Sequence, residues 1–152
     1  MHITKKGCMR IVVTGATGLI GRNLVAKLIA NGDSVAVLTR NGSKATEIFP
    51  SDVDIYQWDY NSDFFPLESL HASDAIVHLT GEPIKGRWTK GKKHRIFQSR
   101  VNSTKNLVSA LTTIKNPPLR VVMASAVGYY GDRGDEKPLK ALCLHTPRLK
   151  WQ

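Results

Sequence analysis

Three glycines at intervals of three residues, Gly15, Gly18 and Gly21, come directly after the β-branched run 11–14. Such a run is typical of a strand buried on both faces, and the glycines interrupt it before a helical pattern begins. Gly15 would permit a sharp reversal, Gly18 would let backbone approach a pyrophosphate, and Gly21 would let helix and strand pack closely. The first N–H groups of that helix lack internal partners and favour an anion, so the pattern predicts a phosphate-binding turn.

The elements around this turn favour dinucleotide binding over an ordinary strand-to-helix connection. Thr17 is placed to cap the helix, and Asn31-Gly32 is suited to end it. The apolar positions of the helix form a stripe that should face a sheet. They are Ile20, Leu24, Val25, Leu28 and Ile29. A second parallel strand is predicted at Ser34 to Thr39.

The second strand delivers Arg40 to the place where the adenosine ribose of a bound dinucleotide would lie. An acidic residue there would bind the 2′-hydroxyl, whereas a guanidinium matches a 2′-phosphate in charge and geometry. Arg40, with Ser43 or Lys44, therefore favours NADP over NAD. The alternative is a solvated loop arginine with no binding role.

Further strands and helices are predicted along the chain. Residues 41–50 form a polar connection with at most a short helix, 54–58 a third strand, 67–71 a short helix and 74–81 another strand. Asp59, at the end of the third strand, either accepts a hydrogen bond from an adenine amino group or forms a turn before Asn61. His78 is expected to be a packed strand histidine rather than a base, because its neighbours are apolar.

A basic, tryptophan-containing loop is predicted at 82–93, followed by a helix at 95–114 and a fifth strand at 120–125. The apolar positions of this helix are Ile96, Phe97, Val101, Leu107, Val108 and Leu111. Cations beside an aromatic residue occur in nucleic-acid sites, in clamps for phosphorylated small molecules and on plain solvated faces. The run is short and follows a predicted nucleotide-binding strand, so we expect no nucleic-acid partner.

Composition is that of a single globular domain: 152 residues, 41% of them hydrophobic, 22% charged, and a net charge of +10. The charge is concentrated in two segments without acids, 85–100 and 137–152. No apolar run reaches the ~20 residues of a membrane span, so no membrane association is expected. Residues 1–8 are expected to be a leader outside the fold, with Met9 as an alternative start. Two separated cysteines, Cys8 and Cys143, suggest the reducing cytoplasm.

Four separated motifs then agree. They are Thr-Gly-Ala-Thr-Gly-Leu-Ile-Gly at 14–21, Leu-Thr-Gly-Glu at 79–82, Gly-Arg-Trp-Thr at 86–89 followed by Ser-Arg at 99–100, and Ser-Ala-Val-Gly-Tyr-Tyr-Gly-Asp at 125–132. Together they resemble the NAD(P)-dependent epimerase/dehydratase family of extended short-chain dehydrogenases, in its nucleoside-diphosphate-sugar epimerase-like branch. The resemblance covers about residues 9–136 and implies a doubly wound, Rossmann-type α/β fold, with helices on both faces of a parallel sheet of about five strands.

The resemblance also implies roles for individual residues. Gly15, Thr17, Gly18, Leu19, Ile20 and Gly21 would hold the pyrophosphate, Arg40 the ribose phosphate, and Leu79, Thr80 and Gly81 the nicotinamide-side ribose. Asp59 and Arg100 complete the cofactor-binding set, and no metal is expected. Ser125 corresponds to the catalytic serine, and Tyr129 or Tyr130 would line the substrate pocket, with Tyr130 as the catalytic candidate.

Two departures from the family pattern stand out. The usual catalytic tyrosine has a lysine four residues later that lowers its pKa, whereas Arg133 and Gly134 stand at those places after Tyr129 and Tyr130. The tail at 137–152 resembles nothing in the family. We therefore expect either a truncation or frameshift near Glu136, or a genuine short variant with a basic tail.

The functional expectation is an NADP-binding, oxidoreductase- or epimerase-like domain with weak or absent turnover on a small, sugar-like substrate. The alternative is a non-catalytic, nucleotide-dependent redox sensor or regulator. An uncovered sheet edge would also invite self-association.

Overall fold

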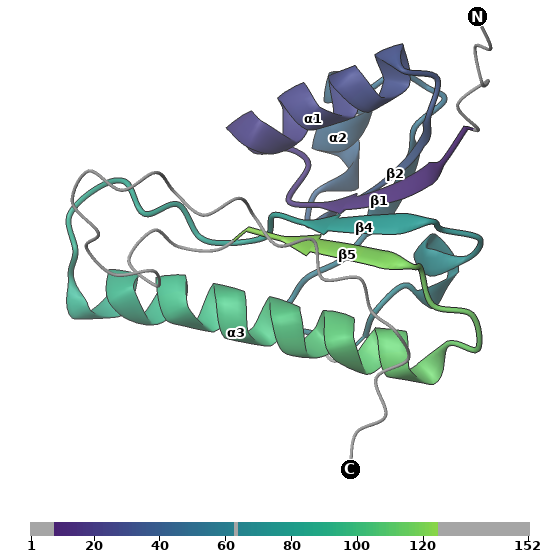
Figure 1. Ribbon diagram of the computed structural model, residues 1–152. Coiled ribbons are helices and arrows are strands. Elements are labelled where there is room, and N and C mark those ends of the chain that lie inside the picture. Colours follow the sequence, from purple (N-terminus) through teal and green to yellow (C-terminus); the bar gives the residue numbers. More distant parts are fainter. Residues whose placement is uncertain (1–7, 63, 125–152) are drawn as a thin grey trace, which may run out of the picture.

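The computed structural model describes residues 8–62 and 64–124, which form one parallel sheet with helices on both faces (Figure 1). The strand order is β3-β2-β1-β4-β5. The strands are β1 (Arg10–Thr14), β2 (Ser34–Thr39), β3 (Asp54–Gln57), β4 (Ala75–His78) and β5 (Arg120–Met123). The helices are α1 (Leu19–Ala30), α2 (Gly42–Ile48), the short 3-10 helix η1 (Leu67–Leu70) and α3 (Lys90–Thr113). The prediction of a doubly wound, Rossmann-type fold is confirmed.

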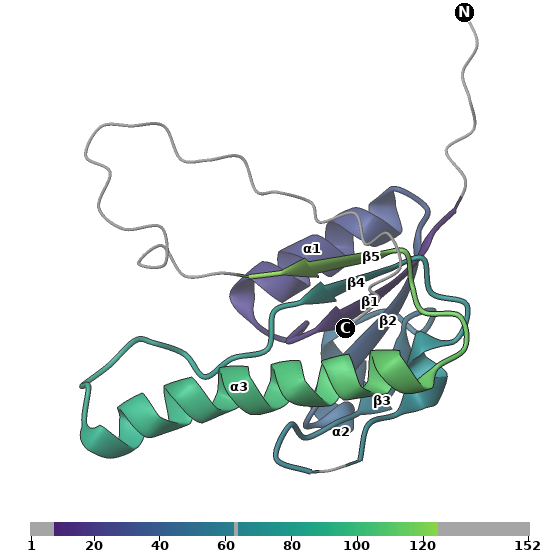
Figure 2. The same ribbon diagram turned by 60° about the horizontal axis from the view of Figure 1, so that its bottom comes forward.

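Two layers of helices enclose the sheet. Helices α1 and α2 lie over one face and α3 crosses the other, as Figures 1 and 2 show together. The chain runs outward from β1 to β2 and β3, then returns to place β4 on the other side of β1. In such sheets a ligand crevice forms outside the carboxyl ends of the strands at this reversal of direction.

The central strands are buried on both faces, which explains their continuous apolar sequence. Val12 and Val13 are both fully buried but point to opposite sides of β1. Val13 belongs to the cluster under α1 and α2, with Val25 and Val37. Val12 belongs to the cluster on the α3 side, which also contains Leu107.

Helix α1 differs from its prediction in two respects. Its N-cap is Gly18 and no side chain caps it, so the prediction that Thr17 is the cap is wrong. Ile20 is 70% exposed and does not belong to the buried stripe. Ile20 lies in the first turn of the helix, and the buried helix residues are Gly21 and Val25.

Helix α3 begins at Lys90, five residues before its predicted start, because the Thr89 side chain accepts a hydrogen bond from the backbone N–H of Lys92. Its buried residues are Ser99, Ser103, Leu107 and Ala110. Phe97 and Val108, predicted on the apolar stripe, are 64% and 45% exposed. Through its serines the helix thus contacts the loop after β4, at Ser99, and β4 itself, at Ser103.

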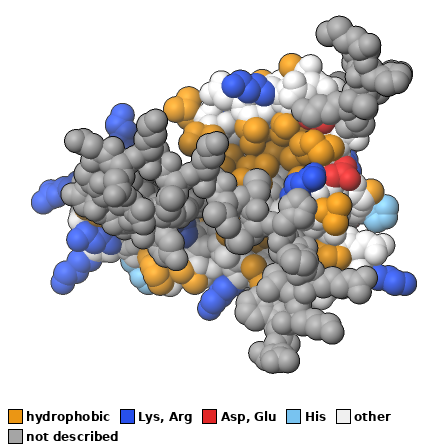
Figure 3. Space-filling view, viewed as in Figure 1, with side chains coloured by type: hydrophobic (Ala, Val, Ile, Leu, Met, Phe, Trp, Pro, Cys, Tyr) orange, Lys and Arg blue, Asp and Glu red, His pale blue; other side chains and the backbone are white. Residues whose placement is uncertain are grey.

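Strand β5 is the less protected edge of the sheet. Among the described residues it pairs only with β4, and its Val122 and Met123 are each 44% exposed. Val122 lies opposite Val77 in the register and so extends the apolar face beside α1. Figure 3 shows hydrophobic side chains gathered between α1 and the strands below it. Within 8–62 and 64–124, no helix is long and apolar enough to cross a membrane.

Candidate nucleotide-binding crevice

A crevice of about 560 Å³ lies at the carboxyl ends of β1 to β4. Each of the four strands contributes the segment that immediately follows it. The lining residues are Gly15, Thr17, Gly18, Arg22, Leu38, Thr39, Arg40, Asn41, Lys44, Trp58, Tyr60, Leu79, Thr80, Gly81 and Glu82. The topology therefore gathers at one place the glycine turn, Arg40 and the loop after β4, although they are far apart in sequence.

The glycine turn has room for backbone only. Gly15 has φ +68°, and a Cβ built there would lie 2.7 Å from the carbonyl carbon of Leu79. A Cβ at Gly21 would lie 2.6 Å from the Cα of Ala16. Real Cβ atoms do not approach other atoms so closely, so both positions require glycine. Gly15 and Gly18 line the crevice, and because they carry no side chain, a dinucleotide phosphate can approach their backbone.

The start of α1 supplies donors that face away from the core. The first intrahelical hydrogen bond at this end runs from the Arg22 N–H to the Gly18 carbonyl, 3.0 Å. The N–H groups of Leu19, Ile20 and Gly21 precede it and belong to the set that a helix leaves without internal partners. The side chains of Leu19 and Ile20 are exposed, so only their backbone suits a phosphate.

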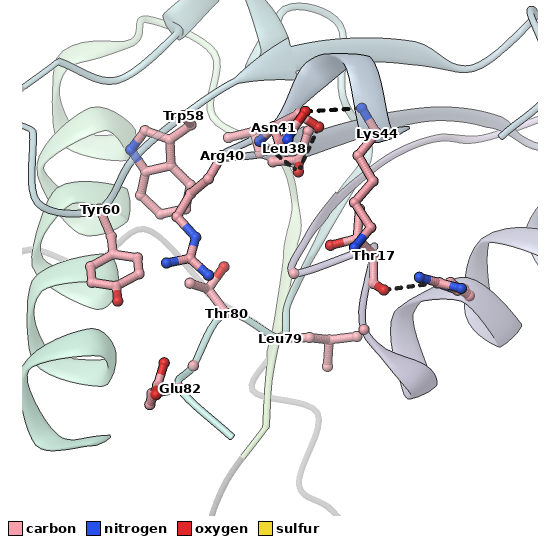
Figure 4. Close-up of a pocket in the computed structure, with 15 residues that line it drawn as sticks. Thr17, Leu38, Arg40, Asn41, Lys44, Trp58, Tyr60, Leu79, Thr80 and Glu82 are labelled. Carbon is pink, nitrogen blue, oxygen red and sulfur yellow. Dashed lines mark hydrogen bonds between the residues drawn. The ribbon is translucent and has the colours of Figure 1, made fainter. Parts of the chain in front are cut away.

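Three cationic side chains lie along the crevice (Figure 4). The Arg22 guanidinium donates through Nε to the Thr17 carbonyl, 2.8 Å. Lys44 extends from α2 toward Thr17, and Arg40 points between Tyr60 and Thr80. The Arg40 guanidinium carbon lies 5.8 Å from the centre of the Tyr60 ring, a distance typical of cation–π contact.

Glu82 is the one acid among the described residues that line the crevice, and it is paired with cations. Glu82 accepts a hydrogen bond from Lys92 Nζ at 2.9 Å, and Arg95 Nε lies 3.8 Å from the same oxygen. The bond from Lys92 is the main cause that holds the pKa of Glu82 below its ordinary value. The wall formed by described residues thus has an excess of positive charge, which favours an anionic ligand.

Two aromatic residues of the wall, Trp58 and Tyr60, did not emerge from the sequence as site residues. Trp58 is 4% exposed and packs on Phe65 with ring centres 5.1 Å apart. Both follow β3, and the pairing of β3 with β2 places them beside Arg40. The sequence did offer one signal for them. Trp58 and Tyr60 follow the carboxyl end of a predicted strand, as Arg40 does.

Two predicted cofactor-binding residues, Asp59 and Arg100, are not among those that line the crevice. Asp59 is exposed, and its carboxylate accepts hydrogen bonds from the backbone and side chain of Asn61 at 2.9 and 3.2 Å, the contacts that the turn interpretation predicts. Arg100 lies behind the wall, within 3.2 Å of a Cβ built at Gly81, and donates to the Ile96 carbonyl. Ser125, Tyr129 and Tyr130 lie outside the described residues.

The parallel sheet, the glycine turn at its switch point and the crevice define a Rossmann-type α/β domain. Residues 11–148 match the model of the NAD dependent epimerase/dehydratase family, and the chain belongs to this family.

Individual relatives agree with this assignment. The chain is 39% identical over 134 residues to the chloroplastic epimerase family protein SDR39U1 homolog of Arabidopsis thaliana, covering 84% of this chain and 37% of that protein. It is 35% identical over 123 residues to the epimerase family protein YfhF of Bacillus subtilis, covering 81% and 39%. Human SDR39U1 (isoform 2), solved with NADPH, superimposes with a TM-score of 0.63 at 30% identity, covering 80% and 38%. The chain thus spans less than two fifths of the length of these relatives.

Proposed function

We propose that this chain binds NADP(H) in the crevice, with the pyrophosphate at the glycine turn and the 2′-phosphate beside Arg40. The observation that carries the proposal is the group of three cations, Arg22, Arg40 and Lys44, around a crevice whose single acid is paired. Arg40 follows β2, where the adenosine ribose lies in folds of this class. The human relative solved with NADPH supports the same choice of cofactor.

The residues that line the crevice are of the kinds that hold a dinucleotide. Gly15 and Gly18 lie where the pyrophosphate would bind, and the N–H groups of Leu19 and Ile20 would supply donors to it. Leu79, Thr80 and Gly81 form the opposite wall, on the side of the nicotinamide ribose. Bound NADPH supplies a hydride, and the chain's own residues would orient the dinucleotide and neutralise its phosphates.

Fluorescence titration of the purified chain with NADPH and NADH tests this proposal. Saturable, tighter binding of NADPH is expected, and absence of saturable binding to either nucleotide overturns the proposal. Arg40→Asp should weaken NADPH roughly tenfold to a hundredfold, because it removes a charge-assisted bond to phosphate. It should change NADH affinity much less. Lys115→Asp, a charge reversal at an exposed position off the crevice wall, should leave both affinities unchanged.

We further propose that turnover by this chain is weak or absent, and that its substrate class in catalytically complete relatives is sugar-like. The sequence supports this proposal, since neither Tyr129 nor Tyr130 has a lysine four residues later to activate it. A screen of NADPH oxidation against nucleoside-diphosphate sugars and simple carbonyls measures it. Robust turnover would contradict the proposal and would also exclude the alternative of a non-catalytic redox sensor. We also propose that the protein is cytoplasmic, which is supported by its two separated cysteines, Cys8 and Cys143.

A further inference from the structure

A buried imidazole lies between β1 and α3, next to the residues that line the crevice. His78 ends β4, is 4% exposed, and has uncharged partners on both ring nitrogens. Its Nδ1 lies 2.7 Å from the Thr14 hydroxyl of β1, and its Nε2 lies 3.1 Å from the Ser103 hydroxyl of α3. Burial lowers the pKa of His78 to about 4, so the ring is neutral at physiological pH.

The neighbouring bonds favour a proton on Nε2. The Ser103 hydroxyl donates to the Arg100 carbonyl at 3.3 Å, which leaves its oxygen to accept from His78 Nε2–H. The Leu79 N–H, which donates to the Thr14 carbonyl at 3.1 Å, also lies 3.2 Å from the Thr14 hydroxyl oxygen, and that hydroxyl can use its own proton on Nδ1. One continuous chain of hydrogen bonds therefore runs from Leu79 through Thr14, His78 and Ser103 to Arg100.

One end of this chain, Leu79, lines the crevice, and its members Thr14 and His78 directly precede crevice residues. Thr14 immediately precedes Gly15, and His78 immediately precedes Leu79. The backbones of Gly15 and Leu79 approach so closely that a Cβ at Gly15 would lie 2.7 Å from Leu79. A change in the separation of β1 and β4 at this point would therefore alter the width of the crevice directly.

We propose that His78, as the neutral Nε2–H tautomer, is a positioning residue that sets the spacing of the glycine turn, the segment after β4 and α3 for the dinucleotide. The inference depends on the proposed function. The described groups that face the ring are the Thr14 and Ser103 hydroxyls and the Trp58 ring, whose centre is 6.5 Å away. None of them is an acid, so nothing among them would stabilise a protonated ring, and a second ring proton would oppose the Thr14 hydroxyl proton.

Two substitutions of the histidine test the role. His78→Phe fills the site but removes both hydrogen bonds, and should weaken NADPH binding about tenfold. His78→Gln keeps one acceptor and one donor, and should restore most of that affinity. Leu107→Ala is the matched control, since it removes buried side chain from α3 outside the hydrogen-bonded chain. It should lower the melting temperature without changing the NADPH affinity.

The outcomes separate the inference from the proposed function. If the unaltered chain binds neither nucleotide, the proposed function and the positioning role of His78 are both overturned. If it binds NADPH but His78→Phe binds equally well, or Leu107→Ala loses as much affinity, only the positioning role is overturned. Long-range ¹H–¹⁵N NMR spectra of the unaltered chain provide a test that needs no variant to fold. They should show His78 protonated at Nε2 alone at pH 7, and the opposite tautomer overturns the inference.

Discussion

The hydroxyl of Ser99, buried on α3, accepts a hydrogen bond of 2.9 Å from the backbone N–H of Glu82. The same hydroxyl donates to the Ile96 carbonyl at 3.0 Å. Glu82 is the point at which the chain leaves the crevice wall for the loop that reaches α3. The helix therefore fixes the direction in which that loop departs.

Ser99→Ala should loosen this loop, because the Glu82 N–H loses its acceptor. An unsatisfied, partly buried donor costs about 1–3 kcal/mol. We expect a lower melting temperature and faster proteolysis within 82–89. Ser109→Ala, at an exposed position of the same helix, is the control and should change neither. Equal cleavage rates in the two variants would contradict the role of Ser99.

Lys92→Met should raise the pKa of Glu82 toward its ordinary value, since the hydrogen bond from Lys92 is the first cause of its lowering. A carboxyl with a lowered pKa adds stability above its unfolded pKa, and that stability is lost as the pH falls through the folded pKa. The variant should therefore lose less stability on acidification. NMR titration of the Glu82 carboxyl measures the shift. Lys93→Met is the control, and identical midpoints in both variants would disprove the pairing.

Gly21→Ala should destabilise the domain by about 1–3 kcal/mol or more, because its methyl group overlaps the Cα of Ala16 at 2.6 Å. Gly42→Ala is the comparison, since nothing lies within 4 Å of a Cβ there. Alanine favours the helix at that position by up to about 1 kcal/mol. Urea unfolding gives both values, and similar losses in the two variants would rule out the packing argument.

Asn106→Asp should destabilise the segment that carries Tyr60. The Asn106 amide donates to the carbonyls of Tyr60 and Ser62 at 3.0 and 2.9 Å, whereas a carboxylate would face them with acceptors only. We expect a loss of about 1–3 kcal/mol at pH 7. Part of it should return at low pH, where the carboxyl is protonated and can donate. Thermal melts at both pH values measure this; Asn116→Asp, at an exposed position after α3, should show no such recovery.

The strands were largely predictable because apolar, β-branched runs have few alternatives. The bounds Ser34 to Thr39 agree with the structure, and the central β1 was found within one residue. The start of α3 was missed because residues 90–94 carry no apolar period, and only the capping threonine marks it. Its buried serines were missed for the same reason, since periodicity detects hydrocarbon and not satisfied hydroxyls.

The crevice was predictable where it depends on the strand ends. Parallel strands bring their carboxyl ends together, so the glycine turn, Arg40 and residues 79–81 were expected around one crevice. Trp58 and Tyr60 line the crevice because β3 pairs with β2, and the sequence of a single strand does not indicate which strand it pairs with. The positions of Asp59 and Arg100 depend on local turns and helix packing.

The part of α3 that is buried through Ser99 and Ser103 should open more readily than the part buried through Leu107. Opening the helix up to Ser103 would expose hydroxyls to water, whereas opening it past Leu107 would expose buried hydrocarbon. Local unfolding should therefore start at Lys90 and stop before Leu107. Backbone amides at 94–103 should exchange with deuterium well before those at 107–113. The C-terminal end of α3 would then stay folded while its N-terminal end opens.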